Sequence, residues 1–156
     1  MTQENELIKA IFITNNTGQI LLNFVNDKEI QSELLSAFIS GLYLFGKEGI
    51  KKIEEITVKG PDLEVYVVQK HGLILTAIFS SAMKQFNLRN EAEAALDGFY
   101  EKYADIIPTW NGDICCFDEF LTLLRTQITE YFKKIQKQEI KPNESKGFWS
   151  RLFKKN

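Results

Sequence analysis

The spacing of apolar residues alternates between two periods along this chain, and the order of the changes predicts its secondary structure. Short β-rich apolar runs, the pattern of strands, occur at residues 7–12, 19–25, 52–58, 63–69 and 73–79. Apolar residues recur instead at three- and four-residue steps over residues 30–46, over 88–106 and after Asp113, which predicts three helices. The predicted order is therefore β-β-α-β-β-β-α-α.

Turn residues between neighbouring strands predict a mostly antiparallel sheet. Asn16 and Gly18 supply positive-φ positions for a tight hairpin after the first strand, and residues 60–62 and 70–72 form turns between the last three strands. We therefore expect an α/β (α+β) domain with a five-stranded sheet, one helix on one face and the two C-terminal helices on the other. The strands at the two margins would be docking edges.

Polar residues mark the ends of the C-terminal elements. Asn87 is a suitable N-cap for the helix over 88–106, and Pro108 follows the end of that helix. Asp113 is expected to open the last helix, whose apolar face fades after Gln136. We assign residues 1–137 to one domain, 138–146 to a polar linker and 147–156 to a basic amphipathic tail.

The composition is that of a single globular domain. The 156 residues are 44% hydrophobic and 26% charged, which is enough to build a core. The polar, acidic N-terminus differs from a signal peptide, so we expect the protein in the cytosol. Its two cysteines, Cys115 and Cys116, are adjacent and cannot connect distant parts of the fold, which suits a reducing compartment.

Charge is distributed unevenly between the body and the tail. The net charge is −2, but residues 141–156 hold five basic residues against one acidic residue, which leaves −6 for residues 1–140. An acidic body argues against a nucleic-acid-binding surface, which needs a basic stripe. A basic tail on an acidic body instead favours contact between the tail and an anionic surface.

Three motifs resemble reactive sites but have structural explanations. Residues 41–47 approach the phosphate-binding pattern G-x-x-x-x-G-K-[ST], but Glu48 replaces the hydroxyl and the segment ends a predicted helix. His71, the single histidine, is expected to be exposed at a turn. One or both of Cys115 and Cys116 are expected to be small core residues rather than metal ligands or a reactive thiolate. We therefore expect no enzyme, no catalytic residue, no cofactor and no metal.

Other polar and aromatic residues also have structural interpretations. Glu54 and Glu55 are expected on opposite faces of a strand, and Asp118 and Glu119 in solvent. Trp110 is expected to be an aromatic plug at the corner between the last two helices, with a partner-contact anchor as the alternative.

The C-terminal tail has the most specific functional pattern. On a helix its side chains segregate into an apolar group and a basic group, namely Phe148, Trp149, Leu152 and Phe153 against Arg151, Lys154 and Lys155. Such a helix suits the surface of an anionic membrane, where each Lys or Arg contributes ~1 kcal/mol. Docking into a partner's groove and packing against the domain's own sheet are the alternatives.

The order of elements resembles the longin fold over residues 7–137. The matching parts are the opening hairpin, the helix over 30–45 and the strand over 73–79 that precedes two helices. The related roadblock fold usually begins with a further helix, for which the six residues before Leu7 leave no room, so the pattern favours longin. Longin domains occur in trafficking SNAREs, in the alpha subunit of the signal-recognition-particle receptor, in adaptor complexes and in GTPase-regulating assemblies.

The resemblance implies a docking function. Proteins of this kind typically bind Ras-like small GTPases or pair with another longin or roadblock domain, whereas no SNARE helix follows residue 140 here. We therefore expect a non-enzymatic longin-like adaptor whose partner is a small GTPase or a second longin or roadblock subunit, with peripheral membrane contact through the tail. The alternatives are a small-ligand sensory domain and a homodimeric structural module.

Overall fold

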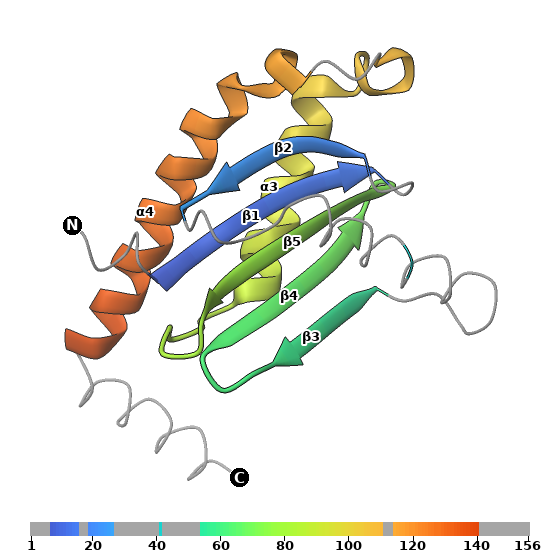
Figure 1. Cartoon of the computed structure of the whole chain (residues 1–156). Helices are drawn as coiled ribbons and strands as arrows, with labels where there is room; N and C mark the ends of the chain where they lie inside the picture. Colours follow the sequence, from blue (N-terminus) through green and yellow to red (C-terminus); the bar gives the residue numbers. More distant parts are fainter. Residues whose placement is uncertain (1–6, 16–18, 27–40, 42–53, 111–113, 141–156) are drawn as a thin grey trace, which may run out of the picture.

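An antiparallel five-stranded sheet is the centre of the computed structural model, which describes residues 7–15, 19–26, 41, 54–110 and 114–140 (Figure 1). Its spatial order is β2-β1-β5-β4-β3, and every neighbouring pair is antiparallel. The predicted α+β class and the five antiparallel strands are confirmed. The strands are β1 (Ile8–Asn15), β2 (Ile20–Val25), β3 (Glu55–Lys59), β4 (Leu63–Lys70) and β5 (Leu73–Ser80).

The central position of β1 and β5 follows from their sequences. Both strands are apolar at nearly every position, and each is buried along almost its whole length. A strand that is covered on both faces needs such a continuous run, whereas a strand with one wet face alternates. The turn between β4 and β5 places His71 at φ 60° and Gly72 at φ 73°, the two left-handed positions of a tight hairpin.

Two long helices, α3 (Leu88–Tyr103) and α4 (Glu119–Ile140), lie on the same face of the sheet, as predicted (Figure 1). Two 3₁₀ turns, η1 (Ile107–Thr109) and η2 (Ile114–Phe117), lie between them in the sequence. Phe99 of α3 is the centre of an aromatic cluster, with its ring 4.9–5.3 Å from the rings of Tyr103, Phe117 and Phe120. This cluster packs α3 against the start of α4.

The opposite face of the sheet is buried as well. Phe12 of β1 and Ile74 of β5 are each 1% exposed, and Ala10 and Ile78 are similarly enclosed. The helix predicted over residues 30–46 falls outside the described residues apart from Gly41. Its place on this face therefore stays a prediction.

The predicted helix starts are only partly correct. Asn87 is the N-cap residue of α3, as predicted, but it adopts a left-handed conformation, with φ 51°, and its side chain makes no capping hydrogen bond. Asparagine tolerates the left-handed conformation better than most residues do. The backbone oxygen of Asn87 accepts a hydrogen bond from the Glu91 amide. The last helix does not begin after Asp113, because η2 comes first and α4 starts at Glu119. No helix among the described residues is long and apolar enough to cross a membrane.

Candidate functional site

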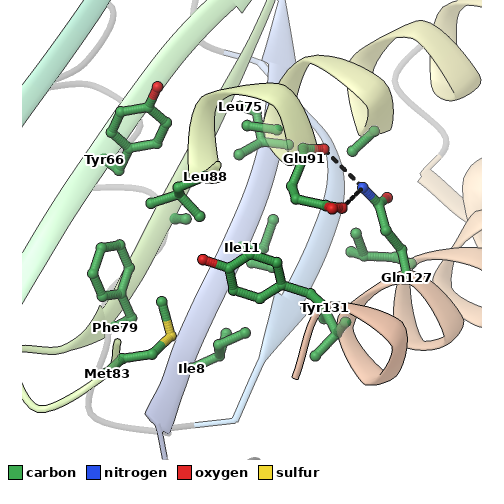
Figure 2. Close-up of a pocket in the computed structure, with 15 residues that line it drawn as sticks. Ile8, Ile11, Tyr66, Leu75, Phe79, Met83, Leu88, Glu91, Gln127 and Tyr131 are labelled. Atoms are coloured by element: carbon green, nitrogen blue, oxygen red, sulfur yellow. Dashed lines mark hydrogen bonds between the residues drawn. The ribbon is translucent and has the colours of Figure 1, made fainter. Parts of the chain in front are cut away.

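A small apolar pocket lies where α3 and α4 meet the sheet (Figure 2). Its volume is about 60 Å³, and its walls come from β1, β4, β5, α3 and α4 together with Met83. The space remains because the two fully buried residues that α3 presents there, Ala92 and Ala95, are small, whereas Phe99 fills the interface one turn farther along. The pocket is therefore a consequence of small residues at a helix–helix contact.

The polar side chains of Glu91, Gln127 and Tyr131 at the pocket are hydrogen-bonded. Gln127 Nε2 donates to the Glu91 carboxylate at 3.1 Å and to the Glu91 backbone oxygen at 2.7 Å, as Figure 2 shows. Lys134 Nζ donates to the same carboxylate at 2.8 Å, and this hydrogen bond raises the pKa of Lys134. The Tyr131 hydroxyl accepts from the Phe86 amide at 2.8 Å, while burial raises the pKa of Tyr131. The rest of the pocket wall is formed by aliphatic and aromatic side chains.

The strand β3 is the open margin of the sheet. Four of its five residues are exposed, and Val58 leaves 48% of its surface in solvent. The opposite margin is more covered, because η2 packs beside β2 and the Arg125 guanidinium lies 5.0 Å from the centre of the Phe24 ring. The predicted docking edges are thus unequal, and β3 is the accessible one.

The hydrogen-bond pattern shows which backbone groups of β3 face outward. Gln69 N donates to Glu54 O, and Gly60 N donates to Leu63 O. Because bonded pairs alternate along an antiparallel ladder, residues 56 and 58 bond to β4, and residues 55, 57 and 59 direct their N–H and C=O groups away from it. The outward groups of Thr57 lie at the middle of the strand.

The structure places the Asp97 carboxylate beside His71, a contact that the sequence pattern does not predict. His71 Nε2 lies 2.7 Å from an Asp97 carboxylate oxygen, and the His71 ring stacks on Tyr100 with centroids 4.4 Å apart. Lys70 Nζ donates to Asp97 at 3.1 Å; this hydrogen bond, and then the one from His71, lower the pKa of Asp97. These groups lie on the surface and tie the β4–β5 turn to α3. Asp97 is 26 residues from His71, so no local pattern connects them.

The paired glutamates do not diverge as predicted. Glu54 and Glu55 both reach Arg89 of α3, at 3.4 and 3.2 Å, and Glu93 binds the same guanidinium at 3.0 Å. Glu54 lies just before β3, so strict alternation does not yet hold, and the wide guanidinium spans both carboxylates. With Glu54 66% exposed, these ion pairs orient α3 more than they stabilise it.

The cysteines, Trp110 and the Asp118–Glu119 pair differ in how deeply their side chains are buried. Cys116 is exposed in the 3₁₀ turn η2, so it is not a core residue, and the prediction that at least one of the two cysteines is buried depends on Cys115. The side chain of Cys115 is outside the described residues. Trp110 is half-buried and packs edge-to-face against Phe117 at 5.7 Å, which confirms its role as an aromatic plug. Asp118 and Glu119 are exposed, as predicted.

Two candidates fall outside the described residues. These are the tail, with its apolar and basic side chains, and the phosphate-loop-like segment after Gly41. Within the part of the chain that the structure describes, no group of three or more His, Cys, Asp or Glu side chains is arranged to hold a metal ion.

Comparison with known proteins identifies the fold. No family model and no curated protein matches the sequence. Among solved structures, Myxococcus xanthus MglB superposes with a TM-score of 0.54 at 16% identity, over 67% of this chain and 89% of that one. The gliding protein MglB from Thermus thermophilus gives 0.45 at 15% identity, covering 53% and 70% of the two chains. A Roadblock/LC7 domain from Streptomyces avermitilis gives 0.41 at 14% identity, covering 53% and 76%. The fold is longin/roadblock-like, and identities this low show the fold alone.

Proposed function

We propose that this chain is a non-enzymatic adaptor that docks a Ras-like small GTPase or a second longin or roadblock subunit along β3. The observation that carries the proposal is the accessible edge of the sheet, where Thr57 and its neighbours direct backbone groups away from β4. A partner strand can add to such an edge through main-chain hydrogen bonds, with side-chain contacts supplying specificity. The partner class comes from the longin/roadblock resemblance.

The surface around β3 has the mixed character of a docking site. Val58 adds an exposed apolar side chain, and Glu54 and Glu55 add negative charge that Arg89 only partly neutralises. A rim of charge around an apolar contact mainly sets specificity and association rate. The site therefore favours a partner strand with a basic residue near an apolar one.

A peripheral membrane contact is the second part of the proposal. Phe148, Trp149, Leu152 and Phe153 would enter the headgroup region, with Arg151, Lys154 and Lys155 near anionic lipids. A segment this short would bind reversibly and bring the docked partner to the membrane. Under this proposal the protein is cytosolic and associates reversibly with the surface of an anionic membrane through its tail.

The test is a binding screen with the full chain. The chain is immobilised and exposed to purified Ras-like GTPases loaded with GDP or with a non-hydrolysable GTP analogue, and to purified longin and roadblock subunits. The proposal expects saturable binding to one of these classes. Absence of binding to every protein of both classes would contradict it.

A homodimer through the same edge is the second candidate, because β3 can pair with β3 of another copy as readily as with a different strand. Sedimentation velocity distinguishes the two, since only the homodimer forms from the chain alone. The sensory alternative has less support. The pocket of about 60 Å³ is far below the roughly 300–1,000 Å³ of ligand sites, and the Glu91 and Gln127 side chains at the pocket already bond to each other.

A further inference from the structure

The pocket between α3 and α4 has the size of a site for one side chain. An engineered cavity of roughly 150 Å³ binds benzene, and a single water needs roughly 10–15 Å³. At about 60 Å³ this pocket accepts the end of one apolar side chain rather than a lipid chain or a cofactor. Such a hollow is the usual receptor for an anchor residue from another segment.

The chemistry of the pocket selects an apolar occupant. Its walls are aliphatic and aromatic, and the carboxylate of Glu91 at its margin already accepts from Gln127 and Lys134. A polar occupant would lose its hydration there without gaining a partner. Half-buried Leu88 and Ile128 also line the pocket, so an entering side chain would gain apolar contact there.

A suitable apolar segment follows α4 in the same chain. Tyr131, at the pocket, is nine residues before the end of α4 at Ile140, a separation of about 14 Å at 1.5 Å per residue. The seven residues 141–147 can span up to about 23 Å when extended. Phe148 and the apolar residues after it can therefore return to the pocket.

Charge favours the same occupant. Residues 141–156 carry +4, and the rest of the chain carries −6. A covalently attached segment of opposite charge meets the body at a high effective concentration, so even a weak contact is well populated. We propose that the pocket is the docking site for the chain's own residues 148–153, with one apolar side chain of that segment inserted between α3 and α4.

Docking and membrane contact exclude each other, because both use the apolar side of the tail. The pocket would then hold the tail until an anionic membrane competes for it. This competition rests on the membrane contact proposed above, whereas docking into the pocket does not.

The test uses Trp149 in the full-length protein as the reporter. The chain has a second tryptophan, Trp110, whose signal is the same in the wild type and in the Trp149→Phe variant. Subtracting the spectrum of the variant from that of the wild type therefore leaves the fluorescence of Trp149 alone. Acrylamide should quench Trp149 severalfold less than it quenches a synthetic peptide of residues 145–156. Equal quenching in chain and peptide would overturn the proposal.

Two substitutions on adjacent positions of α3 localise the contact. Ala95→Leu fills the pocket and should raise quenching of Trp149 to the level of the peptide, whereas Ala94→Leu, at an exposed position, should not. Leu152→Asp, which leaves the domain untouched, should release the tail in the same way. If Ala95→Leu folds and Trp149 stays shielded, or if Leu152→Asp has no effect, the pocket is not the site.

Vesicles separate this inference from the proposed membrane contact. With phosphatidylserine vesicles, Ala95→Leu should bind severalfold more tightly than the wild type, because its tail is already released. Equal binding by the two would overturn the competition. If neither protein binds, the membrane contact is wrong, while the quenching results decide docking independently.

Discussion

Single residues on α3 divide sharply between its buried and exposed sides. Phe99 is fully buried among Tyr103, Phe117 and Phe120, whereas the next residue, Tyr100, is 41% exposed and stacks on His71. The Phe99→Ala substitution should lower the free energy of unfolding by about 3–5 kcal/mol through lost burial and a residual cavity. The matched change Tyr100→Ala should cost about 1 kcal/mol or less. Urea denaturation measures both, and similar losses would contradict the assigned packing.

Asp97 makes a prediction about pH. Hydrogen bonds from Lys70 and His71 lower the pKa of Asp97 below 3.8, so its stabilising contribution is complete above that value and disappears as pH falls through the lowered pKa. Glu93 also lies 3.8 Å from Lys70 and shares this cation. The Asp97→Asn protein should melt below the wild type at pH 7, and the difference between the two melting temperatures should shrink as pH falls below 3.8 through the lowered pKa. A difference that does not shrink as the pH is lowered would show that another effect dominates.

At the scale of elements, α3 carries a glycine that its position does not require. Gly98 lies in the interior of the helix, and a Cβ atom there would meet Phe120 at 3.7 Å, an ordinary contact distance. Gly98→Ala should therefore raise the free energy of unfolding by about 0.5–1 kcal/mol, because alanine loses less backbone entropy in a helix. Thermal unfolding measures the gain. A loss of stability would mean that the contact between α3 and α4 is tighter than the structure shows.

The elements also show what periodicity could predict. β5, α3 and α4 were predicted because long apolar patterns leave few alternatives. The ends of the helices are harder to predict: an asparagine before a helix predicts a capping side chain, whereas Asn87 takes a left-handed backbone and makes no such bond. The 3₁₀ turn η2 has the same apolar spacing as the start of a helix, because i, i+3 and i, i+4 spacings hardly differ over four residues.

At the scale of the whole molecule, the sequence predicted the fold but not the geometry of the site. The strand–helix order led to a longin/roadblock-like fold, which the superposition on Myxococcus xanthus MglB confirms. The inequality of the two sheet margins, the pairing of His71 with Asp97 and the pocket beside Ala95 depend on contacts between distant segments. The apolar pattern of a single segment cannot predict such contacts.

The central claim is that β3 is the docking edge, and Thr57 allows a direct test. Proline at this position removes an outward N–H without breaking a bond to β4, whereas Thr57→Ala keeps that N–H. The measurement is titration calorimetry of the partner found in the screen against wild-type, Thr57→Pro and Thr57→Ala full-length chains. The account predicts binding at least about tenfold weaker for Thr57→Pro, a loss of about 1.4 kcal/mol, and near-native binding for Thr57→Ala. Unchanged affinity in a folded Thr57→Pro protein would contradict docking along β3.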